Sequence, residues 1–257
     1  MIDLTWVDET LTTYIRPQTS PVAAKLIRSP DELPPRVKLP RRDFKSKIPL
    51  CMAIAMARRY GWVVAVGKED QSCPFGALTM GFVKPTRGYL EGTAYALSTP
   101  EAAAGTARSL SRLPAGTYTH LLVAPLPRAS FEPDLVIVYG NPAQVGRLIQ
   151  ATLLKRGGAL STPSVGGIAC SSVVARTLNE DECQYVAVGA GDRIFALTQD
   201  HEMVFTMPVS KVELTLTSLE ESHKKGEARY PTISYLRFEP QLPETFHRLM
   251  ENLEQGE

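Results

Sequence analysis

The cysteines have the most distinctive chemistry in this chain, since a thiolate binds iron or zinc and attacks electrophiles. The 257 residues contain four of them, Cys51, Cys73, Cys170 and Cys183, which is too few for a disulfide scaffold. No two form a C-x-x-C pair, so the strong zinc and ferredoxin signatures are absent. Cys73 and Cys170 each precede a predicted helix, where exposed amides and the helix dipole stabilise a thiolate.

We predict a cofactor site made of three cysteines. Cys51 falls on a predicted buried helix and can supply a third ligand beside Cys73 and Cys170. The site would hold an iron–sulfur cluster or a single metal ion, and three protein ligands leave one position open for a substrate. Cys183 follows an acidic run and is expected on a surface loop. The prediction requires sulfurs that are far apart in the sequence to meet in one pocket.

Two other uses of these residues remain open. Cys170 could be a catalytic nucleophile, with a histidine that the sequence does not identify as its base. Alternatively, the cysteines only pack in the core, and the protein is a non-enzymatic module that binds a small anionic ligand or cofactor. The backbone N–H groups of the glycine turn Gly166-Gly167 would then bind the anion. Arg193 would bind it through its guanidinium. The alternative for Arg193 is a surface ion pair with Asp192. The chain has neither a P-loop nor a G-x-G-x-x-G sequence.

The elements that must position these residues are both helices and strands. An apolar run that closes with Arg58, Arg59 and Gly61 predicts the buried helix of Cys51. The fold class expected is α+β or α/β, a mixed sheet with packed helices and two loosely similar halves. Periodicity and turn residues predict helices over 4–14, 72–82, 98–112, 145–157, 168–177, 208–219 and 242–253, and strands over 62–66, 119–124, 134–139, 185–188, 203–207 and 232–238.

Length and composition indicate one globular domain over residues 1–257, because 44% of the residues are hydrophobic. A proline-rich basic segment at about 25–47 has no useful periodicity and is expected to be a surface connection. A two-lobed division is placed near 157–164. The sequence Gly189–Arg193 is expected to be a flexible turn.

The charge balance limits the partners. Lysine plus arginine number 28 and aspartate plus glutamate 27, so no broad basic field exists and we predict no nucleic-acid partner. The longest apolar run, 48–57, is about half of the ~20 residues needed to cross a bilayer, so no membrane association is expected. The acidic first residues lack the features of a signal peptide, which predicts a cytoplasmic protein. The expected partner is a small-molecule ligand or substrate, and oligomer formation stays open.

Several motifs together resemble the family called domain of unknown function 169, over about residues 45 to 220. They are Cys51 on its helix, Cys73-Pro-Phe-Gly-Ala-Leu-Thr-Met-Gly, Pro133-Asp-Leu-Val-Ile-Val-Tyr-Gly-Asn-Pro, Gly166 to Cys170, and Gly191-Asp-Arg ahead of Glu202-Met-Val-Phe-Thr-Met-Pro. The resemblance implies cysteines that form a cofactor site, in redox or cofactor-related metabolism of an archaeon or anaerobic bacterium. Relatives place a further cysteine where this chain has Gly189, which weakens a four-cysteine cluster and leaves Cys183 as a substitute.

Overall fold

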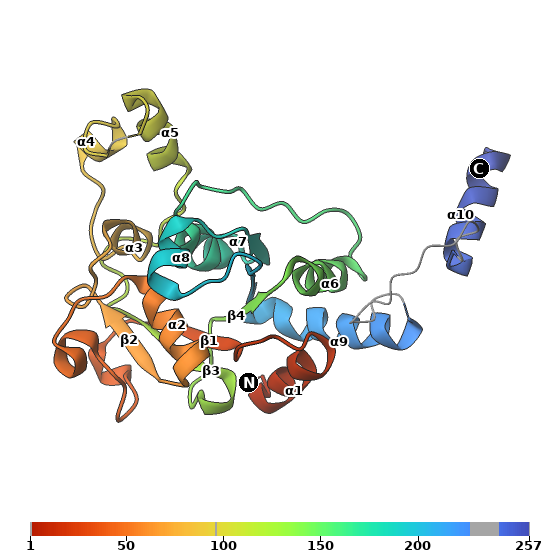
Figure 1. The fold of residues 1–257 in the computed structure, drawn as a ribbon, viewed down its shortest axis with the longest axis horizontal. Helices are drawn as coiled ribbons and strands as arrows, with labels where there is room; N and C mark the ends of the chain where they lie inside the picture. The colour runs from red at the N-terminus through yellow and green to blue at the C-terminus, as the bar shows by residue number, and fades with distance from the viewer. Residues whose placement is uncertain (1, 96, 227–241, 257) are drawn as a thin grey trace.

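A six-stranded sheet runs through the computed structural model, which describes residues 2–95, 97–226 and 242–256 (Figure 1). The strands lie in the order β2-β3-β1-β4-β6-β5, and each pair of neighbours is antiparallel. They are β1 (Val22–Ile27), β2 (Val64–Gly67), β3 (His120–Pro125), β4 (Leu135–Gly140), β5 (Gln184–Val186) and β6 (Met203–Pro208). Helices cover both faces of this sheet, so the expected class is confirmed in its α+β form.

The same strand order occurs in both halves of the sheet. In each half the first strand is central, the third pairs with it, and the second lies at the edge, which gives β1-β3-β2 on one side and β4-β6-β5 on the other. The halves join where β1 pairs with β4, with Ala23 opposite Val136. The two loosely similar halves therefore share one continuous sheet.

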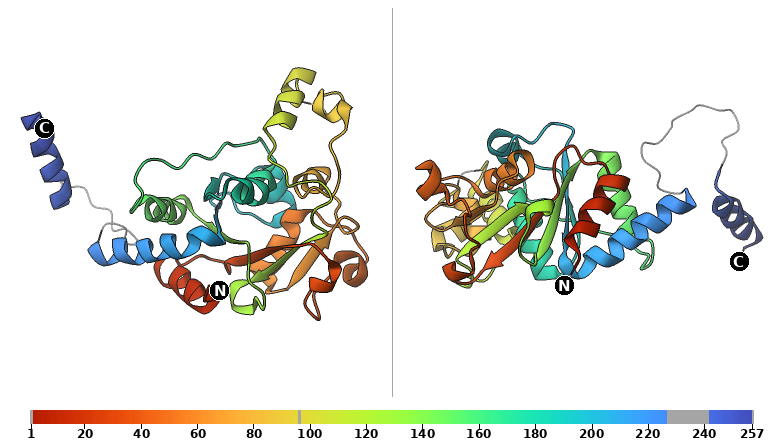
Figure 2. Two further views of the ribbon diagram at one scale, coloured as in Figure 1. Left: turned by 180° about the vertical axis from the view of Figure 1, so that it is seen from behind. Right: turned by 90° about the horizontal axis from the view of Figure 1, so that it is seen from below.

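The helices form a layer on each face of the sheet (Figures 1 and 2). On one face lie α1 (Leu4–Tyr14), α6 (Pro142–Leu153) and α9 (Val209–Lys225). On the other lie α2 (Leu50–Tyr60), α3 (Pro74–Thr79), the π-helical segment η4 (Ser171–Arg176) with α7 (Thr177–Glu180), and α8 (Ala190–Ala196), which packs on α2.

Further helical segments complete the fold, and among them η3 (Leu126–Arg128) packs against α1 through the buried Leu126. Figure 1 shows α4 (Arg87–Leu90) and α5 (Pro100–Ser109) projecting from the rest of the chain between β2 and β3. The last helix is α10 (Glu244–Gln255), and further short segments are η1 (Pro30–Glu32) and η2 (Pro40–Phe44). Within the described residues, no helix is both long enough and apolar enough to cross a bilayer.

The central strand β4 is buried on both faces, which explains its nearly continuous apolar sequence. Side chains alternate along a strand, so neighbouring residues enter different cores. Ile137 and Tyr139 pack with α2 and η4, whereas Val136 and Val138 pack with α1, α6 and α9. The candidate site described below lies on the side of Tyr139.

Local capping signals identify several helix boundaries correctly. The side chain of Asp3 accepts hydrogen bonds from the backbone N–H groups of Thr5 and Trp6 at the start of α1. Asn141 and Gln144 form a capping box at the start of α6. Gly61 ends α2 in a left-handed conformation with φ of 71°. The boundaries at Asp3 and Gly61 confirm the prediction, whereas α6 begins at Pro142, before the predicted start at 145.

The expected surface connection at 25–47 is wrong at its start. Residues 25–27 belong to β1, which pairs with β3 and β4 in the middle of the sheet. Lys25 is only partly buried and stands opposite Leu122, so one charged residue does not prevent a central strand. The apolar residues Val22, Ala23 and Ala24, which precede the basic segment, begin the strand and extend it into that segment.

The expected flexible turn at Gly189–Arg193 is also wrong. Gly189 is the N-cap of α8, and the residues after it are helical. Glycine content led to the wrong prediction, although the helix itself is anchored by Ala196, which is fully buried. The strand expected over 232–238 lies outside the described residues.

Candidate functional site

Three of the four cysteines line a single cavity of about 400 Å³ on the α2 face of the sheet. Cys51, Cys73 and Cys170 come from three separate segments and contribute to the same wall. The remaining lining comes from neighbours of these cysteines, from Tyr95, and from Gly191, Asp192 and Phe195 of α8. The tertiary structure thus brings together the three thiols that the sequence separates by more than 100 positions.

Each cysteine of this cavity is at the beginning of a helical segment. Cys51 is the second residue of α2. Cys73 is the N-cap of α3, and its backbone N–H donates to the side-chain oxygen of Gln71 over 3.0 Å. Cys170 immediately precedes η4, and its Sγ lies 3.6 Å from Oγ1 of Thr79 in α3. Three helix starts therefore converge on one space.

Burial keeps two of these thiols protonated in the absence of a cation. Desolvation raises the pKa of Cys170 to about 12, with a smaller increase from the charge of Asp192. Desolvation, followed by the charge of Asp192, also raises the pKa of Cys51 well above its ordinary value. Without a bound cation, the loss of water opposes the stabilisation of a Cys170 thiolate that was expected from the helix N-terminus.

Asp192 is a buried carboxylate beside the thiols. It is the third residue of α8, and its side chain has 6% relative exposure. The hydroxyl of Tyr139 donates a hydrogen bond to Oδ1 over 3.3 Å. Desolvation raises the pKa of Asp192 to about 6, although Tyr139 and the charge of Arg58 favour the ionised form. Asp192 was weighed from the sequence only as a surface partner of Arg193.

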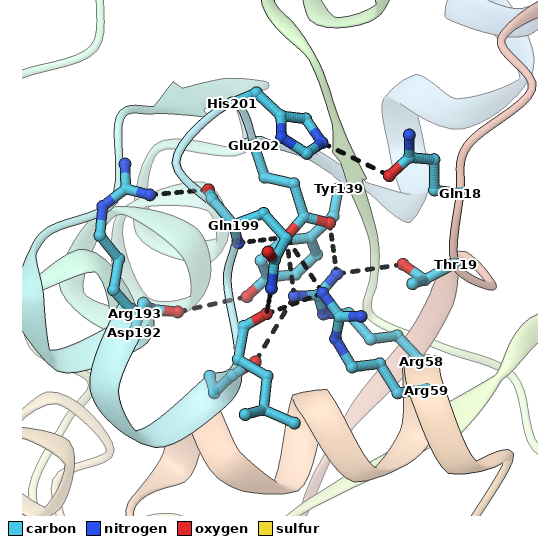
Figure 3. Close-up of polar contacts among 12 residues, drawn as sticks. Gln18, Thr19, Arg58, Arg59, Tyr139, Asp192, Arg193, Gln199, His201 and Glu202 are labelled. Carbon is cyan, nitrogen blue, oxygen red and sulfur yellow. Dashed lines mark hydrogen bonds and ion pairs between the residues drawn. The ribbon is translucent and has the colours of Figure 1, made fainter.

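An ion-pair network packs against Tyr139, the hydrogen-bond donor of Asp192 (Figure 3). The guanidinium of Arg58 lies 3.9 Å from the ring centroid of Tyr139 and donates to both oxygens of Glu202, over 2.7 and 3.2 Å. Arg59 also reaches Glu202, at 3.3 Å. The network joins the end of α2 to the segment before β6. The two arginines were interpreted from the sequence as charges that suit a helix C-terminus, so their buried partner was missed.

Near the cavity, the backbone at Gly189 approaches the backbone at Gly167 very closely. Gly167 lines the cavity and follows Gly166, which has a φ of 42°. A Cβ at Gly189 would lie only 2.5 Å from the Cα of Gly167. A side chain at 189 would force these backbones apart, so this chain needs glycine where the family resemblance implies a cysteine in relatives.

Arg193 and Cys183 lie away from the cavity wall. Arg193 donates to the carbonyl of Gln199 over 2.6 Å and pairs with Asp200 at 3.2 Å. Cys183 is fully buried in the core on the opposite face of the sheet, with Phe205 among its neighbours, so the prediction of a surface loop is wrong. The acidic residues before it misled the prediction because the chain turns inward directly after them. Burial raises the pKa of Cys183 to about 11.

The arrangement of the side chains bears on the kind of metal site that could form. Among residues 2–95, 97–226 and 242–256, no group of three or more His, Cys, Asp or Glu side chains could hold a metal ion as arranged. The cysteines thus share a cavity wall without surrounding a single point.

Comparison with known proteins agrees with the resemblance that the motifs indicated. A family model described as "Uncharacterised ArCR", domain of unknown function 169, matches residues 10–218. An uncharacterised protein of Methanocaldococcus jannaschii is 26% identical over 205 residues, which are 77% of this chain and 86% of that protein. No solved structure matches the chain. The matched region includes all the elements that line the cavity.

Proposed function

This chain belongs to the uncharacterised ArCR family, domain of unknown function 169, and we propose that its three-cysteine cavity binds an iron–sulfur cluster for redox or cofactor-related metabolism. The observation that carries the proposal is the shared cavity of Cys51, Cys73 and Cys170. Thiolates are the ligands that hold such clusters in proteins. Three of the four cysteines of the chain line this cavity, and the fourth, Cys183, is buried on the opposite face of the sheet.

The described side chains give no support to a single metal ion, so we propose the cluster form of the site. A single zinc or iron ion needs its ligands gathered around one point at bonding distance, and the described side chains are not arranged in that way. In a [4Fe–4S] cluster each iron would be held by one cysteine, so Cys51, Cys73 and Cys170 would bind three of its four irons. With three cysteines, one iron keeps a position that a substrate or an exogenous ligand can occupy.

The raised thiol pKa values are compatible with cluster binding, because a bound cation reverses them. A coordinating thiol is deprotonated outright by the metal, and the protons are released on binding. The same values give less support to Cys170 as a free nucleophile, since a thiol with a pKa of about 12 contains little thiolate at neutral pH. The anionic-ligand alternative also loses support, because Asp192 lines the cavity and Arg193 does not.

The test is anaerobic purification followed by reconstitution with iron and sulfide. We expect bound iron and sulfide, with visible absorption and a paramagnetic signal after reduction. Alanine at Cys51, Cys73 or Cys170 should each reduce the iron content at least several-fold. The matched control is Cys183→Ala, which removes the buried thiol on the opposite face and should keep the cluster.

Two results would contradict the proposal. One is a colourless protein with no bound iron after reconstitution. The other is an equal loss of iron in the Cys183 variant and in the three cavity variants, because that pattern would show non-specific binding. Circular dichroism of each variant before reconstitution separates loss of the ligand from loss of the fold.

A further inference from the structure

We propose that the same cavity binds a small organic cation, a protonated amine on an aromatic or other apolar body, with Asp192 as its partner. This goes beyond the proposed function, since the ligand would be held by a carboxylate and aromatic side chains and not by the cysteines. Three observations support it: the lack of an ion pair for Asp192, its position on the cavity wall, and the chemistry of the remaining lining.

Asp192 has no cationic side chain bonded to it among the described residues. The one side-chain hydrogen bond that it receives comes from the neutral hydroxyl of Tyr139. The two nearest guanidinium groups are engaged elsewhere, Arg58 with Glu202 and Arg193 with Asp200, as Figure 3 shows for the first pair. A buried carboxylate is costly unless a positive charge or several donors compensate it. Asp192 therefore retains capacity for a cationic partner.

Asp192 belongs to the same cavity lining as the thiols of Cys51 and Cys170. Asp192 lines the cavity, and its charge raises the pKa of both Cys51 and Cys170, which requires proximity to both sulfurs. Tyr139, which is almost fully buried, covers the other side of the carboxylate. A ligand that enters the cavity can thus reach Asp192 directly.

The rest of the lining suits an apolar body with a positive group. Phe75 and Tyr95 pack edge to face with centroids 4.8 Å apart, and Phe195 is a third aromatic residue of the wall. No lysine or arginine of the described residues lines the cavity. Aromatic faces attract cations, and a carboxylate binds an ammonium more strongly where water is excluded. A volume of about 400 Å³ is in the range of small-molecule sites.

One aromatic residue of the cavity lining is largely exposed to solvent. Phe195 is 52% exposed although it is one of the aromatic lining residues. Its neighbour on α8, Ile194, is 68% exposed. A bound aromatic amine would cover part of Phe195 and so gain apolar contact area in addition to the ion pair.

The experiment compares three probes of the same shape, benzylamine, benzyl alcohol and benzoate, by ligand-observed NMR and calorimetry at pH 8. Asp192 is ionised at this pH. We expect benzylamine to bind at least tenfold more tightly than benzyl alcohol, and benzoate to bind least. In Asp192→Asn the affinity for benzylamine should fall about tenfold or more, while that for benzyl alcohol should stay unchanged. Glu213→Gln removes the same charge from an exposed carboxylate of α9, on the opposite face of the sheet, and should change neither affinity.

The probes are measured with the metal-free and with the iron-reconstituted protein, and iron is assayed on the same samples. Binding of benzylamine that depends on Asp192 without any cluster would leave this inference standing while the proposed function fails. A cluster that forms normally, with equal binding of benzylamine and benzoate, would overturn the inference alone. The comparison of the three probes on the unchanged chain needs no variant, so it decides the question even if Asp192→Asn does not fold.

Discussion

At the scale of single residues, the ionisation of Asp192 opposes folding. Burial raises its pKa to about 6 in the folded chain, above the value of about 3.9 for an unfolded one. The folded state therefore holds the proton more tightly. The stabilisation of the folded state by the protonated Asp192 carboxyl group is complete below about pH 4 and is lost as the pH rises through 6. A functional carboxylate in this position thus costs stability at neutral pH.

We predict that Asp192→Asn makes the metal-free protein more stable at pH 8, by up to about 3 kcal/mol, because the shift of about two pKa units disappears. The advantage should largely disappear at pH 4, where the carboxyl group is protonated in the folded state and about half protonated in the unfolded one. Urea unfolding of both proteins at the two pH values measures the difference. An advantage of the same size at pH 4 and pH 8 would mean that packing, and not ionisation, is responsible.

At the scale of elements, the pair of Arg58 and Glu202 fastens α2 to the segment that leads into β6. Both side chains are almost fully buried, at 0% and 3% exposure. Burial alone would raise the pKa of Glu202, but the hydrogen bond from Arg58, assisted by the backbone of Gln199, lowers it below its ordinary value. The ionised Glu202 therefore stabilises the fold at a pH above its unfolded-state pKa. This stabilisation is lost as the pH falls through the pKa of Glu202 in the folded protein.

We predict that Glu202→Gln destabilises the protein by about 3–5 kcal/mol, because it leaves the charge of Arg58 buried without a full partner. The same network lies behind Tyr139, so the loss should also weaken binding at Asp192. The control is Glu69→Gln, which removes an exposed ion pair with Arg41 and should change the free energy of unfolding by less than about 1 kcal/mol. Chemical denaturation measures the free energy of unfolding of both variants. An equal loss in the two would contradict a larger stabilisation by the buried pair of Arg58 and Glu202.

At the scale of the whole molecule, the described residues form two large cores and two smaller clusters, and α10 belongs to none of them. One core lies between the sheet and α2 with η4, and the other between the sheet and α1, α6 and α9. No residue of α10 is buried. Its apolar side chains remain exposed, including Leu249 at 55% and Leu253 at 63%.

We predict that Leu249→Glu changes the melting temperature by no more than about 1–2 °C, because an exposed side chain loses no buried contact. The comparison is Leu216→Ala in α9, which removes a fully buried side chain and should cost about 2–5 kcal/mol. Thermal unfolding followed by circular dichroism measures both. A large fall for Leu249→Glu would show that the apolar face of α10 is covered in solution.

The features that were predicted well depend on neighbours in the chain. Asp3 caps α1 through backbone groups two and three residues away, and Gly61 ends α2 directly after its last helical residue, so the local sequence suffices. The apolar run of β4 likewise predicts a strand. Cys183 was misplaced because the burial of a residue depends on the side chains that pack over it, and its acidic neighbours give no information about those.

By itself, the sequence determined most helices and most strands, the family, and the choice of three cysteines as a candidate site. Periodicity and capping are local, so hydrogen bonds and apolar burial within a few residues already specify them. Only the tertiary structure decided that Cys51, Cys73 and Cys170 share a cavity and that Asp192 joins them, while Arg193 turns away. Those facts depend on which face of the sheet each helix covers, and that is settled by packing between segments far apart in the chain.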